Sequence, residues 1–146
     1  MVFQNYAIFP HLTVAENVAY GLKAKKCPKD QIPGKVEEAL ELVQIGKLKD
    51  RKPNELSGGQ QQRVGVARAL ACDPKIIFAD EPTGNLDSET GAKVEELLFN
   101  YNKQEGATLI IVTHDVDLAK KCDYQILIKD GKIKGSNIPK EGKSGR

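Results

Sequence analysis

The chain has 146 residues, of which 40% are hydrophobic and 29% are charged, a length that suits one domain with its own core. The formal net charge is +2, but residues 129–146 hold six Lys or Arg against two acids, so the basic excess belongs to this end and predicts no nucleic-acid-binding face. No apolar run approaches the ~20 residues of a membrane span, and the amino terminus has no signal-peptide pattern. Three widely spaced cysteines predict neither a zinc site nor a disulfide set, and they favour a reducing cytoplasm.

Two helices are predicted in the first third of the chain. Thr13 and Glu16 form a capping box ahead of apolar residues that recur every four positions, which predicts a helix from about Val14 to Lys25. A second periodic stretch, residues 36–43, predicts a helix that Gly46 ends in the left-handed conformation.

Pro53 closes this helical region, so residues 12–55 are expected to form a small helical subdomain. The segment Leu56-Ser57-Gly58-Gly59-Gln60 comes next, ahead of a helix expected over Val64–Ala71. Ser57 can cap this helix, and the two glycines let backbone N–H groups approach an anion at its positive end. Taken alone, Ser-Gly-Gly is more typical of a turn that only starts a helix.

Three short apolar runs rich in β-branched residues come later in the chain, at Lys75–Asp80, Thr108–Thr113 and Tyr124–Lys129. Such runs are typical of strands that are buried on both faces. Helices predicted over Ser88–Lys103 and Asp115–Lys121 separate them, and alternating strands and helices predict an α/β fold with a parallel sheet.

The expected α/β core spans about residues 56–134 and, with the helical subdomain, forms one domain over 1–134. Residues 135–146, rich in Gly, Lys and Ser, are expected to be a flexible basic tail. In a parallel sheet the ligand binds at the carboxyl ends of the strands, where Asp80 and Thr113 lie.

Acidic and imidazole side chains come directly after two of the predicted strands. In P-loop ATPases the acid at such a strand end holds Mg²⁺, usually through water, and the next acid polarises the attacking water, which gives these roles to Asp80 and Glu81. A solvated strand end before the turn at 82–84 is the alternative. His114 comes after the second strand and can contact a γ-phosphate or act as an ordinary surface residue.

Together these segments resemble the ATP-binding-cassette (ABC) family from residue 1 to about 134, in the family's order. Leu56–Gln60 matches its signature motif and Ile76–Glu81 its Walker B strand with the catalytic glutamate. Asn85–Asp87 resembles its D-loop, and His114 its switch histidine. Val2-Phe3-Gln4 resembles its Q-loop, in which Gln4 bridges the metal and the membrane partner.

The resemblance implies ATP and Mg²⁺ as cofactors and a P-loop NTPase-like core. It also implies pairing with a second ABC ATPase subunit, so that Ser57, Gly58, Gly59 and Gln60 contact the γ-phosphate of a nucleotide held by the partner. Asp87 of the D-loop is expected to bind nucleotide as well. Transmembrane transporter subunits are expected to dock on the helical subdomain, which places the chain at the cytoplasmic face of a membrane. The short segment between Gln4 and Ser57 favours a transporter over a chromosome-maintenance ATPase.

The sequence given does not contain the family's phosphate loop, Gly-x-x-x-x-Gly-Lys-Ser/Thr, or its adenine-stacking aromatic residue. This loop supplies the main grip on the β- and γ-phosphates, so we expect these 146 residues alone to bind ATP weakly and not to hydrolyse it.

Three functions remain open: the ATPase subunit of a transporter, a truncated cassette that only interacts with complete subunits, and an ABC ATPase not linked to transport. The direction of transport is open as well, because residues 5–11 resemble importer cassettes whereas Gly84–Asp87 resembles cassettes of lipoprotein and macrolide exporters.

Overall fold

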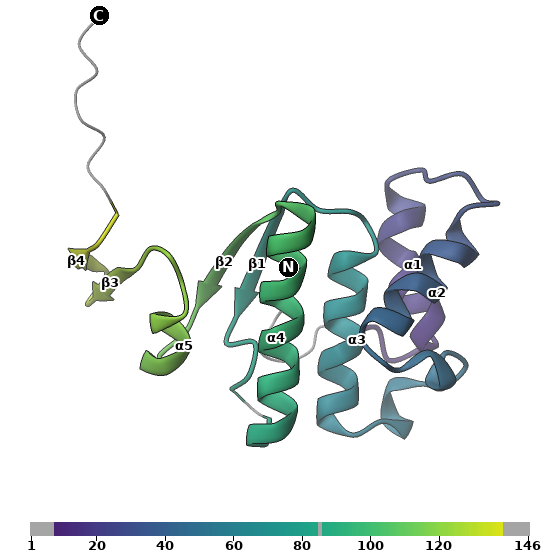
Figure 1. Cartoon of the computed structure of the whole chain (residues 1–146). Coiled ribbons are helices and arrows are strands. Elements are labelled where there is room, and N and C mark those ends of the chain that lie inside the picture. Colours follow the sequence, from purple (N-terminus) through teal and green to yellow (C-terminus); the bar gives the residue numbers. More distant parts are fainter. Residues whose placement is uncertain (1–7, 85, 139–146) are drawn as a thin grey trace, which may run out of the picture. The chain divides into compact units, whose positions relative to one another are not determined.

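A computed structural model describes residues 8–84 and 86–138 of the chain (Figure 1). The fold combines helices with a small parallel sheet, and the chain divides into two compact units, one ending at Val112 and the other beginning at Thr113. In the described ranges, no helix has both the length and the apolar character needed to cross a bilayer.

Helix α1 spans Val14–Ala24 and begins at the predicted capping box. The Thr13 hydroxyl accepts from the Glu16 N–H at 3.2 Å, and the Glu16 carboxylate accepts from the Thr13 N–H at 2.7 Å. The predicted start is therefore confirmed, because both interactions satisfy donors that the first turn of a helix leaves open.

Helix α2 spans Ile32–Leu42, and the prediction that Gly46 ends it in the left-handed conformation is wrong. Gln44 takes that conformation, with φ of 58°, while Gly46 begins the 3₁₀ helix η1 at Gly46–Leu48. The N–H of Ile45 donates to the carbonyl of Leu40 at 2.9 Å, which completes a Schellman turn. Since Ile45 is only 3% exposed, the turn comes two residues early to bring this side chain into the core.

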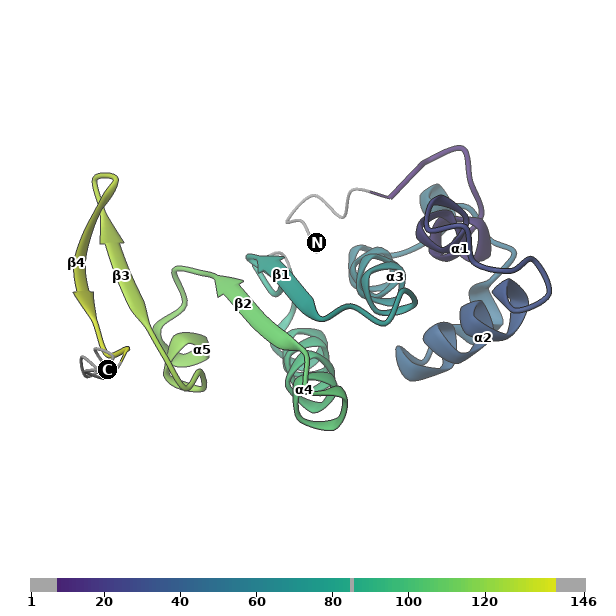
Figure 2. The same ribbon diagram turned by 90° about the horizontal axis from the view of Figure 1, so that it is seen from above.

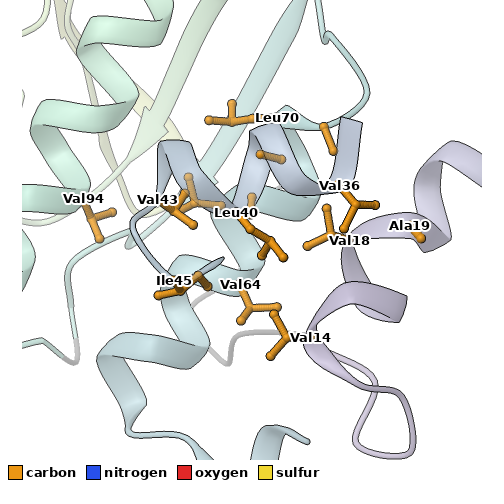
Figure 3. Close-up of a cluster of buried hydrophobic side chains, with 14 of the residues drawn as sticks. Val14, Val18, Ala19, Val36, Leu40, Val43, Ile45, Val64, Leu70 and Val94 are labelled. Carbon is orange, nitrogen blue, oxygen red and sulfur yellow. The ribbon is translucent and has the colours of Figure 1, made fainter. Parts of the chain in front are cut away.

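A second 3₁₀ helix, η2 at Pro53–Glu55, leads into α3, which spans Gly58–Leu70. Helix α3 therefore begins six residues before the expected start. Its buried side chains meet those of α1, α2 and α4 in one hydrophobic cluster, in which Figure 3 shows Val14, Val64 and Leu40. The helical segment before residue 56 thus shares one core with α3 and α4.

Strands β1 (Ile76–Asp80) and β2 (Thr108–Val112) pair in parallel, joined by helix α4 (Ser88–Glu105). This βαβ unit confirms the predicted order of strand, helix and strand. In the view of Figure 2, α4 covers one face of the two-stranded sheet. On that face Ile77 and Ala79 are 1% exposed and pack in the core cluster with Val94 of α4.

The opposite face of this sheet is apolar and open. Its large apolar side chains are Ile76 (52% exposed), Phe78 (45%), Ile110 (40%) and Val112 (59%), and the strand register places Asp80 and Thr108 on the same face. The expectation that these strands are buried on both faces is therefore wrong for the described residues, because α4 covers one face only.

The second unit contains helix α5 (Val116–Lys120) and the antiparallel strands β3 (Ile126–Lys129) and β4 (Lys132–Ser136). Strand β3 does not join the parallel sheet, which corrects the expectation for the run 124–129. Asp130 and Gly131 both have positive φ, 51° and 69°, so they form a tight turn that reverses the chain into β4. The last two residues of β4, 135 and 136, fall in the segment expected to be a tail.

The open face of the β1–β2 sheet makes self-association of the 146-residue chain the expected behaviour, because association removes this apolar surface from water. We expect light scattering to show a mass above that of the monomer that rises with concentration. Phe78→Thr keeps a strand-favouring residue and should shift the mass towards the monomer. The control Val116→Thr, at a 65% exposed position of α5, should not. A monomeric parent protein, or an equal effect of the two variants, would contradict this interpretation.

Candidate functional site

The first turn of α3 presents the candidate anion-binding segment. Ser57 is the N-cap: its hydroxyl accepts from the Gln60 N–H at 3.3 Å, and the Gln60 side-chain oxygen accepts from the Ser57 N–H at 2.9 Å. Gly58 and Gly59 occupy the first two helical positions, whose N–H groups have no partner within a helix. Ser57 and Gly58 are exposed, so a phosphate can reach these donors at the positive end of the helix.

Gly59 lies against the start of α4. A Cβ added to Gly59 would lie 2.8 Å from Cγ2 of Thr90, closer than carbon atoms pack. Glycine at this position therefore allows the amino ends of α3 and α4 to approach each other.

The candidate carboxylates lie where β1 ends. Asp80 is the last residue of β1 and is exposed, opposite Val112 in the sheet. Glu81 has φ of 45°, a left-handed conformation that is costly for a residue with a Cβ. Its N–H donates to the carbonyl of Val112 at 2.8 Å, which fixes the backbone beside the end of β2.

The chain turns sharply after Glu81. The N–H of Gly84 donates to the Glu81 carbonyl at 3.2 Å, and the N–H of Leu86 donates to the Thr83 carbonyl at 3.1 Å. A Cβ built on Gly84 would lie 3.6 Å from Oε2 of Glu81, so the carboxylate folds back beside this turn. Strained backbone that the surroundings hold in place is common at functional sites.

Asp87 is the N-cap of α4. Its carboxylate accepts from the Thr90 N–H at 2.9 Å and from the Thr90 hydroxyl at 2.8 Å. These two hydrogen bonds, the backbone one first, hold the pKa of Asp87 below its ordinary value. In this structure the carboxylate thus caps a helix, and its predicted role towards nucleotide stays a prediction.

Direct contacts connect α3 to the segment after β1. The side chain of Gln62, 2% exposed, donates from Nε2 to the carbonyl of Pro82 at 2.6 Å. Gly59, in the first turn of α3, also lies close to Thr90. The first two turns of α3 therefore lie against residues 82 and 90. The structure therefore brings Ser57, Gly58, Gly59 and Gln60 into the same part of the first unit as Glu81 and Asp87.

His114 belongs to the second unit, where it is exposed and precedes the N-cap of α5. That cap is Asp115, whose Oδ1 accepts from the N–H groups of Asp117 and Leu118 at 2.8 and 3.2 Å. Gln4 and Asn85 lie outside the described residues, so their predicted roles stay predictions.

The described residues at this site can bind Mg²⁺ through a carboxylate that acts together with water and phosphate. The described part of the chain has no cluster of three or more His, Cys, Asp or Glu side chains that could hold a metal. Mg²⁺ needs no such cluster where one or two carboxylates act together with water and substrate phosphates. Asp80, exposed at the end of β1, can supply such a carboxylate.

Two buried polar residues of the first unit were missed in the sequence, and only the second contacts the candidate site. Asn17 is 0% exposed, and its Oδ1 accepts a hydrogen bond from the Phe9 N–H at 2.7 Å. Its Nδ2 donates to the carbonyls of Phe9, Leu12 and Thr13. Gln62 is the second. The available signal was a polar residue at an inward position of each helix, since a buried amide requires hydrogen-bond partners.

Comparison with known proteins gives the class to which this arrangement belongs. A family model described as "ABC transporter" matches residues 1–84 of this chain. The chain belongs to the ABC transporter family.

Curated relatives and solved structures agree with this assignment. The chain is 45% identical over 141 residues, 96% of its length, to the spermidine/putrescine import ATP-binding protein PotA of Marinobacter nauticus. It is 44% identical over 142 residues to the Fe(3+) ions import ATP-binding protein FbpC of Fusobacterium nucleatum. It spans 38% of the length of each of these relatives.

The solved structures include the ATP-binding cassette MJ0796 in a dimeric post-hydrolysis state bound to ADP and Pi. The TM-score is 0.84 and the identity 41%, over 92% of this chain and 60% of that one. This likeness confirms the expected ABC ATPase core as the fold class, with its partial parallel sheet and helical subdomain.

The Asp87 cap generates a pH-dependent prediction. The pKa of Asp87 is lower in the folded chain than in the unfolded chain, where it is about 3.9. The ionised carboxylate therefore stabilises the fold at pH values above the unfolded pKa, and this contribution is lost as the pH falls through the folded pKa. Asp87→Ala should lower the urea midpoint at about pH 7 and have a smaller effect at about pH 3.

Asp87→Asn retains an oxygen that can cap the helix, so it should lose less stability at neutral pH than Asp87→Ala. The control is Asp50→Ala, at an exposed acid after η1. An effect of Asp87→Ala that is the same at both pH values would show that the charge contributes nothing.

Proposed function

We propose that this chain is part of the ATP-hydrolysing subunit of an ABC membrane transporter, in which ATP hydrolysis drives transport. The observation that carries the proposal is the hydrogen bond from Gln62 to the Pro82 carbonyl. It connects α3, whose glycine-rich start is exposed, to the residue directly after Glu81. A phosphate-binding helix start and a carboxylate for water activation are the parts that phosphoryl-transfer chemistry requires.

In the proposed mechanism Glu81 accepts a hydrogen bond from the attacking water and orients it, with His114 assisting. Gln4 and Asp80 would help to hold Mg²⁺, whose charge would stabilise the phosphate oxygens when the ion is bound. The water-activating carboxylate must stay fixed because misplacing it costs rate. The anchored Glu81 backbone, with its N–H bonded to Val112, supports this role.

A second ABC ATPase subunit is the proposed partner at the nucleotide. Ser57, Gly58, Gly59 and Gln60 would contact the γ-phosphate bound by that subunit, with Asp87 at the same interface. Exposure of the first α3 turn supports this arrangement. So do the dimeric forms in which the MJ0796 cassette was solved.

Transmembrane subunits are the proposed partners of the helical segment, which would place the chain at the cytoplasmic face of a membrane. An aromatic surface supports this docking. Tyr20, 51% exposed, lies 4.5 Å from the ring of Phe9, and the guanidinium of Arg68 lies 5.4 Å from the same ring. Aromatic and Arg side chains are enriched in protein interfaces.

The names of the relatives favour import over export. The Marinobacter nauticus and Fusobacterium nucleatum proteins are both named import ATP-binding proteins, at 45% and 44% identity. Their names give different substrates, so they support the direction of transport and not one substrate.

The proposed catalytic role is tested in this chain joined at its amino end to the preceding segment of the Marinobacter nauticus relative, which we call the extended chain. Glu81→Gln should abolish ATP turnover yet keep ATP binding, because an amide preserves shape but is a poor base. Asp80→Asn should weaken the Mg²⁺ dependence. The control Glu96→Gln, at an exposed position of α4, should keep parent activity. Turnover of Glu81→Gln at the parent rate would exclude Glu81 as the catalytic carboxylate.

The proposed partner contact is tested by mixing the 146-residue chain with the extended chain carrying Glu81→Gln, which should hold ATP without hydrolysing it. Size-exclusion chromatography should show a heterodimer with ATP and none without it. Ser57→Arg in the 146-residue chain should abolish the heterodimer, because it puts bulk and charge where the phosphate must approach. The control Ser136→Arg adds the same side chain in β4 and should not. A heterodimer that forms without ATP, or with Ser57→Arg, would reject contact through the α3 start.

A further inference from the structure

The side chain of Gln62 is buried and bonded to the segment directly after Glu81. It lies on α3, is 2% exposed, and donates from Nε2 to the carbonyl of Pro82 at 2.6 Å. The two residues are 20 positions apart, so the bond links two elements and does not serve the helix itself. A buried amide that lost this partner would be left with an unsatisfied donor or acceptor.

The bonded carbonyl belongs to the residue directly after Glu81. With φ of 45°, Glu81 holds a conformation that is unfavourable for a residue with a side chain and persists only where its surroundings impose it. Two hydrogen bonds flank it. On one side the Glu81 N–H bonds to the Val112 carbonyl at 2.8 Å, and on the other Gln62 bonds to the Pro82 carbonyl.

Gln62 is also close to the phosphate-binding end of α3. It comes five residues after Ser57, in the second turn of the helix whose first turn Ser57 caps. The same helix touches the far end of the segment, where Gly59 lies against Thr90. A shift of the α3 start must therefore displace the backbone next to Glu81 or break the bond from Gln62.

We infer that Gln62 is a positioning residue: its hydrogen bond to Pro82 holds the carboxylate of Glu81 in place and couples that carboxylate to the helix start at Ser57. This inference rests on the proposed function, since it takes Glu81 as the group that orients water. Gln62 itself does not touch the reacting atoms. It acts by fixing where the carboxylate lies when phosphate binds at the α3 start.

The first test is Gln62→Met in the extended chain. Methionine has nearly the length of glutamine but cannot donate, so the side chain still fills its place while the bond to Pro82 is lost. We expect kcat to fall by about tenfold or more, because small displacements of a catalytic group cost rate steeply, while the KM for ATP stays within about twofold.

Asn102→Leu is the matched control. Nδ2 of Asn102 donates to the carbonyl of Ala107, also at 2.6 Å, at the opposite end of α4 from Asp87. The substitution Asn102→Leu removes the same kind of hydrogen bond far from Glu81 and Pro82. It should therefore lower thermal stability and leave kcat unchanged. A fall in kcat that is equal in the two folded variants would show that Gln62 is merely structural.

Gln62→Glu provides a second variant whose bond can be switched. Protonated glutamic acid can donate to the Pro82 carbonyl and ionised glutamate cannot. The ratio of its kcat to that of the parent should therefore fall as the pH rises, with folding checked at each pH. If Gln62→Met does not fold, this ratio decides alone, and a ratio that does not change with pH overturns the inference.

The two proposals fail in different ways. If Glu81→Gln keeps turnover, the proposed function is wrong. If Glu81→Gln abolishes turnover but folded Gln62→Met keeps the parent kcat, only the positioning role is wrong.

Discussion

Burial of helix α3 is the constraint on which the first unit depends. Val64, Val66 and Ala67 are 0% exposed and lie in the same cluster as side chains of α1, α2 and α4. Full burial of aliphatic side chains contributes roughly 1.5–3 kcal/mol for each residue the size of Val or Leu. Because helices α1, α2 and α4 contribute side chains to that cluster, the position of α3 constrains where the helical segment and the βαβ unit lie.

The polar site depends on this burial. Once α3 is fixed, its exposed first turn presents Ser57 and the two glycines, and its second turn directs Gln62 to the Pro82 carbonyl. The same helix thus exposes the proposed phosphate-binding turn at one point and bonds to the residue after Glu81 at another.

Local interactions explain which elements could be predicted. The capping box of Thr13 and the β-branched runs of β1 and β2 each depend on a few neighbouring residues. The hairpin turn of the second unit is also a local signal, because Asp130-Gly131 is a typical type I′ pair, whereas the apolar run before it favours the parallel sheet. An apolar run does not distinguish a buried parallel strand from a hairpin strand, whereas the two positive-φ turn residues do.

The sequence by itself determined the family, the motif order and the candidate residues, because motif spacing and periodicity are properties of the chain alone. Only the tertiary structure decided that Gln44 and not Gly46 turns the chain after α2, since the burial of Ile45 selects the turn. It also decided which polar residues anchor the site. Gln62 lies 20 positions from Pro82, and no local pattern connects them. Their bond exists because packing of α3 brings the amide to that carbonyl, where burial makes an unpaired donor costly.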